Sequence, residues 1–280
     1  MQVIESVNDM QSLAVALRSQ GKLIALVPTR GSLHAGHRRL VEVAKKEADR
    51  VVLSIFVNPH EFGPNEDLAQ FPRDREGDLA FCREAEVDSV FIPPDAEMYP
   101  PGYSTWVEET RRAAGMCGLS RPHYFRGACT AFVKLFNIVR PDSVVMGWRD
   151  AQLASVVRKT IEDLNFPVDI TMVETARAED GVALNARNAY FDDFQRRDAP
   201  VIYQSLLKGK ALVDGGITNV DRVLAEITHH MSQNRRIRLI YVSAVDRMTM
   251  EPVRQIEPGR TLLAAAAWCD QVRLIDNVLV

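Results

Sequence analysis

The sequence predicts an α/β fold that contains a parallel β-sheet. Up to residue 174, short runs of apolar residues alternate with longer segments whose apolar residues recur at helical spacing. The apolar runs are almost uninterrupted, which is typical of strands that are buried on both faces of a parallel sheet. After residue 174 the order changes to helices followed by strands, which predicts a second, smaller α+β domain.

Strands and helices are expected in alternation over the first part of the chain. The expected strands cover residues 22–27, 51–57, 88–92, 143–146 and 168–173, and the expected helices cover residues 36–49, 77–86, 130–139 and 150–164. Leu40, Val43 and Ala44 share one side of the first helix. The third helix stops before Pro141, because proline cannot continue it. This alternation predicts helices on both faces of the sheet.

The second part of the chain is expected to hold two helices and then three strands. The helices are expected over residues 193–214 and 220–234, and the strands over residues 237–245, 261–267 and 272–277. Two long segments in the first part, 58–75 and 93–126, are rich in proline, glycine and charge. Long connections of this kind often bind ligands.

The composition of the chain excludes several classes of protein. Of 280 residues, 46% are hydrophobic, enough for a sizeable core, and the net charge of −3 argues against a dedicated nucleic-acid-binding surface. The longest apolar run, residues 262–269, is too short to span a membrane, and no export signal precedes the first strand. The four cysteines lie far apart, which favours reduced thiols and a cytoplasmic protein.

The segment Pro28-Thr29-Arg30-Gly31-Ser32-Leu33-His34-Ala35-Gly36-His37 follows the first expected strand and opens the first long helix. His34 and His37 can share one face of that helix, and Gly36 lets a ligand approach the backbone closely. A helix start offers N–H groups and a positive dipole end that suit phosphate, to which imidazoles can also donate. The alternatives are two partly buried histidines or a metal pair. An HxxH pair without a third ligand is weak support for metal, so no metal site is expected.

The His-x-Gly-His element resembles the nucleotidylyltransferase superfamily. More of the chain resembles the pantoate–β-alanine ligase family in particular. The matching segments are VVLSIFVNPHEF (51–62), FPR (71–73), EMYP (97–100), RPHYFRG (121–127), KLFNIVRPD (134–142), GWRDAQ (147–152), EDGVALNARN (179–188) and LIDNV (274–278). They follow in order from near one end of the chain to the other, so the resemblance covers essentially the whole sequence.

This resemblance implies a Rossmann-like, ATP- and acid-binding domain over residues 1–174 and a small C-terminal lid domain over residues 175–280. It also implies a homodimer and a two-step reaction of small-molecule substrates. A carboxylate first attacks Mg²⁺-bound ATP and forms an acyl adenylate, and an amine then displaces AMP. The products of such a ligase are an amide, AMP and pyrophosphate.

By the same resemblance, the catalytic residues are His34, His37, Arg149 and Arg187. Residues that match the ATP site are Pro28, Thr29, Arg30, Gly31, His34, Gly36, His37, Gly147, Trp148, Arg149, Asp150, Leu184, Asn185, Ala186 and Arg187. Asp150 is expected to bind the ribose, and ATP is expected between the histidines and the 147–150 loop, with Arg187 closing over it.

Several of these positions depart from the family pattern. Trp148 and Arg149 stand where the family has Glu and Lys, and Asn185 and Ala186 stand where it has serines. Arg149 keeps the positive charge, although a guanidinium is not equivalent to an ammonium.

The expected acid pocket departs further from the family pattern. Arg30 stands where the family has Met, and Glu61 and Leu153 stand where it has two glutamines that hydrogen-bond pantoate. One interpretation is that Arg30 and Glu61 pair and leave a weaker pantothenate-forming enzyme. The other is a changed acid substrate.

Four functions follow from these alternatives. They are a pantoate–β-alanine ligase, a divergent amide ligase for another small acid, a nucleotidyl transferase that stops after adenylyl transfer, and a non-catalytic nucleotide-binding protein.

Overall fold

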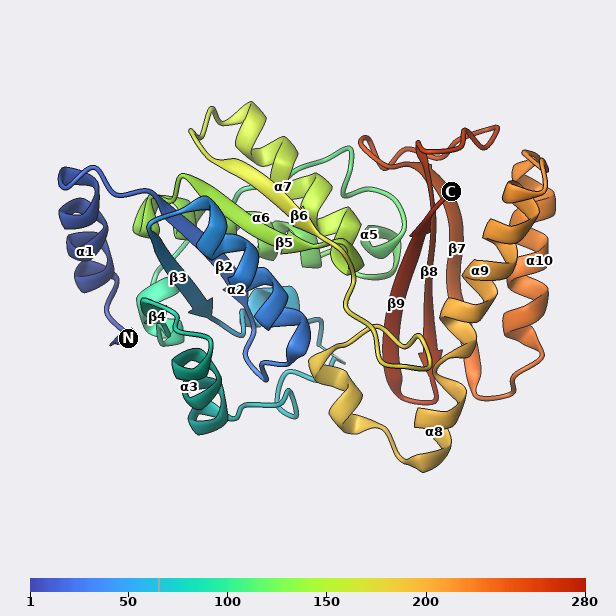
Figure 1. Ribbon diagram of the computed structural model, residues 1–280, viewed down its shortest axis with the longest axis horizontal. Coiled ribbons are helices and arrows are strands. Elements are labelled where there is room, and N and C mark those ends of the chain that lie inside the picture. Colours follow the sequence, from blue (N-terminus) through green and yellow to red (C-terminus); the bar gives the residue numbers. More distant parts are fainter. Residues whose placement is uncertain (65) are drawn as a thin grey trace. The chain divides into compact units, whose positions relative to one another are not determined.

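A computed structural model of the chain describes residues 1–64 and 66–280 (Figure 1). Contacts between Cα atoms divide it into two compact units. The first unit comprises Met1–Thr110, Arg121–Gly147 and Val156–Glu174. The second comprises Arg111–Ser120, Trp148–Ser155 and Thr175–Val280, so two short segments from the middle of the chain belong to it.

The first unit contains a six-stranded sheet in which all strand pairs are parallel. In sheet order the strands are β1 (Gln2–Ile4), β4 (Ser89–Phe91), β3 (Arg50–Ile55), β2 (Ile24–Thr29), β5 (Ser143–Gly147) and β6 (Asp169–Val173). The central strand β2 begins with four buried residues in succession, as a strand covered on both faces requires. The predicted α/β class with a parallel sheet is therefore confirmed.

Helices connect these strands. They are α1 (Val7–Ser19), α2 (Ala35–Glu47), α3 (Arg75–Glu84), the short α4 (Asp95–Met98), α6 (Tyr124–Val139) and α7 (Ala151–Asp163). Right-handed crossovers place α2 and α3 on one face of the sheet and α1 and α6 on the other. On the first face, Val41 of α2 and Cys82 of α3 share a buried cluster with Val27, Leu53 and Val145 of the strands.

Strand β1 and helix α1 were not predicted from the sequence. Ser6 caps α1 by accepting a hydrogen bond from the backbone N–H of Asp9, and Met10, Ala14 and Leu17 are buried along one side of the helix. This is the usual spacing of an amphipathic helix that packs against a core.

The second unit contains an antiparallel sheet of three strands, β7 (Ile237–Asp246), β8 (Thr261–Cys269) and β9 (Val272–Leu279). Helices α8 (Asp193–Asp198), α9 (Val201–Asp214) and α10 (Val220–Ser232) precede it, and α9 and α10 cover one face of the sheet (Figure 1). Met116, near helix α5 (Cys117–Ser120), and Ala151 contribute to a separate apolar cluster with residues of β7 and β8. These contacts explain why the two short segments belong to this unit.

The prediction of one helix over residues 193–214 is wrong. Helix α8 ends at Asp198 and α9 begins at Val201, with Pro200 at its N-cap. Proline has no N–H for a helical hydrogen bond, so it starts a new helix instead of continuing the old one.

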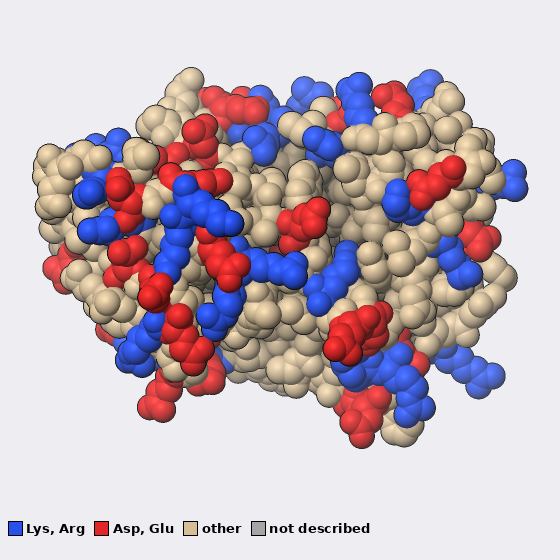
Figure 2. All heavy atoms as spheres, viewed as in Figure 1, with Lys and Arg blue, Asp and Glu red and all other residues tan. Residues whose placement is uncertain are grey.

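The visible surface carries charges of both signs. Figure 2 shows lysine and arginine side chains interspersed with aspartate and glutamate, in keeping with the balanced composition. Within residues 1–64 and 66–280, no helix has both the length and the apolar character that crossing a bilayer requires.

Candidate active site

The expected phosphate-binding segment lies at a topological switch point of the parallel sheet. Strands β2 and β5 are neighbours, but the chain proceeds from β2 to β3 on one side and from β5 to β6 on the other. The carboxyl ends of the two strands are Thr29 and Gly147. Open α/β sheets bind ligands in the crevice outside such strand ends.

Side chains accept hydrogen bonds from successive backbone N–H groups of the loop after β2. The Thr29 hydroxyl accepts from the N–H of Gly31 at 3.2 Å and donates to the carbonyl of Ser54 at 2.8 Å. The carboxylate of Asp78 accepts from the N–H groups of Ser32 and Leu33 at 3.0 and 2.7 Å. The loop therefore has a defined conformation before any ligand binds.

His34 and His37 cap helix α2 together. His34 Nδ1 accepts from the N–H of Gly36, and His37 Nδ1 accepts from the N–H of His34, both at 3.1 Å. A ring nitrogen that accepts a hydrogen bond carries no proton, so each neutral ring bears its proton on Nε2. The two ring centroids are 4.1 Å apart. The capping arrangement thus fixes the tautomer of both histidines and makes each Nε2 a donor.

These contacts occupy backbone groups that the sequence analysis expected to bind phosphate. The sequence suggested N–H groups at the helix start as phosphate donors, but those of Gly31 to His34 and of Gly36 already bond to side chains. The N–H of His37 bonds to the carbonyl of His34. Most N–H groups at this helix start are therefore already bonded within the protein.

Arg30, in the same loop, forms a largely buried ion pair with Glu61. The Arg30 Nε donates to Glu61 Oε2 at 2.8 Å, and its Nη2 donates to the same oxygen and to the Tyr124 hydroxyl, the latter at 2.9 Å. The Glu61 side chain is 7% exposed and that of Arg30 is 27% exposed. The structure thus supports the interpretation in which the two charges neutralise each other.

A short 3₁₀ helix, η1 (Pro59–Glu61), positions Glu61. The buried Asn58 caps it and donates to both Glu61 Oε1 and the carbonyl of Gly127, at 3.3 and 3.0 Å. Gly127 allows α6 to approach closely, since a Cβ there would lie 2.3 Å from the carbonyl oxygen of His60. Asn58 and Gly127 both fall in segments that matched the family pattern.

In the second unit, the segment after Gly147 is a 3₁₀ helix, η2 (Trp148–Asp150). The Arg149 guanidinium donates to Asp150 Oδ2 from Nε and Nη2, at 3.1 and 2.7 Å, and from Nη1 to the carbonyl of Leu184 at 2.9 Å. Two segments with expected nucleotide contacts, 147–150 and 184–187, are therefore linked by the Arg149 side chain.

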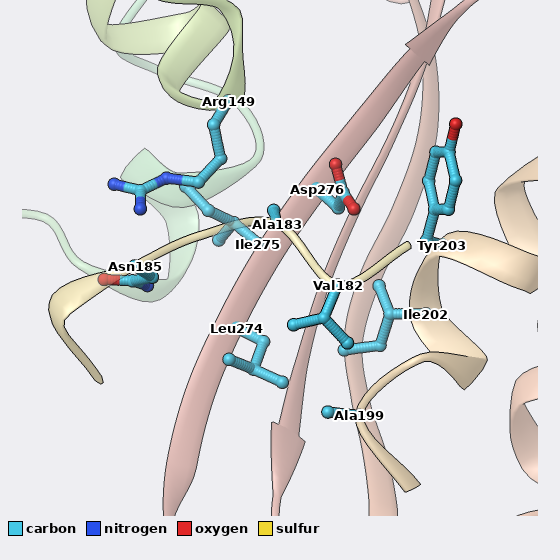
Figure 3. Close-up of a pocket in the computed structure, with 10 residues that line it drawn as sticks. All are labelled: Arg149, Val182, Ala183, Asn185, Ala199, Ile202, Tyr203, Leu274, Ile275 and Asp276. Atoms are coloured by element: carbon cyan, nitrogen blue, oxygen red, sulfur yellow. The ribbon is translucent and has the colours of Figure 1, made fainter. Parts of the chain in front are cut away.

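The remaining predicted residues of the second unit lie on or just before η3 (Ala186–Tyr190) and on α7. Asn185 caps η3 by accepting from the backbone N–H of Arg187 at 3.2 Å, while Leu153 on α7 is buried. A small hollow adjoins Arg149 and Asn185. In Figure 3 these two polar residues lie at one side of the hollow, and the apolar side chains of Val182 and Ile202 lie together away from them.

Sequence reasoning missed a buried ion pair beside this hollow. Arg177 donates two bonds to the Asp276 carboxylate, at 2.6 and 2.8 Å, and its guanidinium lies over the ring of Tyr203 at 3.6 Å. Burial raises the pKa of Asp276, although Arg177 counteracts that rise. Both residues lie in or beside matched segments, but nothing in the spacing of those segments pairs them.

Comparison with known proteins identifies the family. A family model described as "Pantoate-beta-alanine ligase" matches residues 2–279. The chain belongs to the pantoate–β-alanine ligase family. Pantothenate synthetases from Thermosipho africanus (strain TCF52B) and Thermotoga petrophila are 43% and 42% identical to it, each over 100% of both chains.

Solved structures of the family agree with the fold. The pantothenate synthetase of Thermus thermophilus superimposes with a TM-score of 0.93 at 36% identity, covering 100% of this chain and 99% of that one. The pantoate–β-alanine ligase of Francisella tularensis, complexed with β,γ ATP and β-alanine, gives 0.82 at 28% identity, covering 100% and 97%. The predicted ligase family and fold class are confirmed, whereas the roles of individual residues stay predictions.

Proposed function

We propose that this ligase joins pantoate to β-alanine at the expense of ATP. A pantoate carboxylate oxygen attacks the α-phosphorus of ATP, the bond to the bridging oxygen breaks, and pyrophosphate leaves with the electron pair. The β-alanine amine then attacks the acyl carbon of the adenylate, loses a proton, and AMP leaves. Full-length membership of the family is the observation that carries this proposal.

The histidine pair would serve the first step. Negative charge builds up on the departing pyrophosphate, and the Nε2–H groups of His34 and His37 would donate hydrogen bonds to it. Their Nδ1 atoms are bonded to the main chain, so neither ring needs to reorient when the charge develops. Fixed donors of this kind stabilise a transition state without a reorganisation cost.

Residues of the second unit would serve the nucleotide. We propose that Asp150 binds the ribose and that Arg149 and Arg187 bind phosphate oxygens. Trp148, Leu184, Asn185 and Ala186 would line the nucleotide site, together with Gly147 at the end of β5. Because Arg149 bonds to Asp150, phosphate binding by Arg149 would require the two side chains to share or exchange partners.

Magnesium enters this proposal as the counter-ion that ATP brings. Among the described residues there is no group of three histidine, cysteine, aspartate or glutamate side chains that could hold a metal ion. No step of the proposal depends on a resident metal ion.

Pyrophosphate and AMP release test the activity. With ATP alone, neither product should form. With pantoate added, a single turnover of pyrophosphate is expected, and with pantoate and β-alanine both products should form continuously. Pyrophosphate release that continues without an amine would favour an adenylyl transferase, and no release with any acid would favour a non-catalytic protein.

The Arg30–Glu61 pair supports a second candidate, a ligase for another small acid. A carboxylate buried beside the expected acid pocket would repel a carboxylic acid substrate unless Arg30 compensates for it. Leu153 would favour an apolar substituent. A panel of small acids, assayed for pyrophosphate release, separates the candidates: turnover of another acid well above that of pantoate would support the second one.

We also propose a cytoplasmic homodimer whose N-terminal domain, residues 1–174, binds ATP and the acid, and whose C-terminal domain, residues 175–280, acts as a lid. Light scattering after size-exclusion chromatography tests the dimer, and a molar mass of one chain would contradict it.

A further inference from the structure

The buried carboxylate of Asp78 has no catalytic role in the proposal above. Asp78 lies in the first turn of α3 and is 4% exposed. Its two oxygens accept hydrogen bonds from the backbone N–H groups of Leu33 and Ser32. Among the described residues, no ion pair is found for this carboxylate. Burying a charged carboxylate that is bonded only to main-chain N–H groups costs folding free energy. The presence of such a group at this position therefore needs an explanation.

The loop that Asp78 contacts has an unfavourable backbone conformation. Gly31 and Ser32 both have positive φ angles, +79° and +51°. Glycine adopts such angles readily, but for serine they are unfavourable. A Cβ at position 31 would also lie 2.7 Å from Asp78 Oδ2, so glycine is required for the carboxylate to approach.

We propose that Asp78 is a positioning residue that holds this loop in its conformation and thereby places the His34–His37 pair. The Asp78 contacts lie one and two residues before His34, whose side chain begins the cap of α2. Without them, Ser32 can relax toward a negative φ, and the loop that leads into the histidines shifts. The inference rests on the proposed role of those histidines in ATP cleavage.

The test compares Asp78→Asn with Asp74→Ala. Asparagine has nearly the same shape as aspartate but presents an NH₂ group to one of the two backbone N–H groups. Asp74 caps the same helix by accepting from the N–H of Gly77 at 2.9 Å, so its replacement weakens α3 without touching the loop. For Asp78→Asn we expect kcat for pyrophosphate release to fall about 10- to 100-fold with a smaller change in KM for ATP, because a misplaced reacting group loses rate on this scale. Asp74→Ala should keep the wild-type kcat and lose thermal stability.

A second measurement does not depend on activity. Amide hydrogen exchange of a peptide that contains residues 31–34 should accelerate in Asp78→Asn and stay unchanged in Asp74→Ala. Adding Ser32→Gly to Asp78→Asn should restore part of the lost kcat, because glycine accepts the positive φ without strain. Unchanged exchange and unchanged kcat in Asp78→Asn would overturn the inference. If the wild type releases no pyrophosphate, the proposed function fails, while the exchange data still decide whether Asp78 holds the loop.

Discussion

Two pairs of side chains in the first unit have members on the loop after β2. Different interactions hold the two pairs in place. His34 and His37 are bonded through Nδ1 to backbone N–H groups, so the helix start itself holds them. Arg30 and Glu61 hold each other through opposite charges, with Tyr124 as a further partner. The backbone-held pair suits chemistry that is the same for every acid substrate. The charged pair is formed between side chains, so a substitution can alter it without changing a backbone hydrogen bond of the loop.

Replacing His37 should have the largest effect. We expect His37→Ala to lower the rate of pyrophosphate release about 100-fold or more, the scale of losing one transition-state donor. It also removes the acceptor for the N–H of His34. Stopped-flow or quenched-flow assays of pyrophosphate would measure the loss.

A histidine elsewhere provides the control for this experiment. His230 in α10 bonds to the Ser205 hydroxyl at 2.8 Å and has no role in the proposed site. His230→Ala should leave the rate of pyrophosphate release unchanged. An equally active, folded His37→Ala protein would show that the backbone-held pair is only a helix cap.

Breaking the Arg30–Glu61 ion pair should have a smaller effect, and it should act mainly on the free energy of unfolding. Arg30→Met and Glu61→Gln should each destabilise the protein, because each leaves a largely buried charge without its partner. Since Arg30 is partly exposed, we expect a coupling free energy of roughly 1–3 kcal/mol between the two substitutions. Urea unfolding of the wild type, both single variants and the double variant gives this quantity. Strictly additive effects would mean that the pair is not an energetic unit.

The same variants bear on the acid substrate. If the charged pair weakens the fit to pantoate, Glu61→Gln together with Leu153→Gln should raise kcat/KM for pantoate. A wild-type enzyme that already turns over pantoate as fast as its relatives would contradict this prediction. It would mean that Arg30 and Glu61 neutralise each other without changing the acid substrate.

The smallest expected effect is a pH dependence of stability at Asp78. Burial raises the pKa of Asp78, and the N–H groups of Leu33 and Ser32 offset the rise only in part. The folded state therefore binds the proton more tightly than the unfolded chain, whose aspartates titrate near about 4. The stabilisation from this group is complete below that pH and is lost as pH rises through the raised pKa. The difference in free energy of unfolding, wild type minus Asp78→Asn, should decrease as the pH rises above about 4. An increase would show that folding favours the charged carboxylate.

Most of the fold could be predicted from sequence because its strands are apolar runs and its helices are amphipathic. The missed helix α1 carried the same signals, a serine cap at Ser6 and buried residues at helical spacing, so it was predictable in principle. Strand β1 has only three residues, and its role depends on pairing with β4, far along the chain. No local pattern reveals such a partner.

The candidate site was predictable as a set of residue types but not as a set of contacts. The motif around His34 and His37 pointed to phosphate chemistry, and the alternative of an Arg30–Glu61 pair was stated from charge alone. That the histidines accept from the backbone, and that Asp78 reaches the same loop from α3, depends on tertiary geometry. Spacing in the sequence does not contain that information.

The position of β1 at the edge of the sheet has a consequence for synthesis on the ribosome. Strand β1 cannot pair until its partner strand β4 has been synthesised, because Gln2 lies opposite Ser89 and Ile4 opposite Phe91. Strands β2 and β3, which pair over six residues each, can associate before β4 is made. Strand β1 must therefore remain unpaired until residue 91 has been made, and it then adds to a sheet that β2 and β3 have already begun. A rigid restraint on β1 would interfere at that late docking step, after β2 and β3 have already associated.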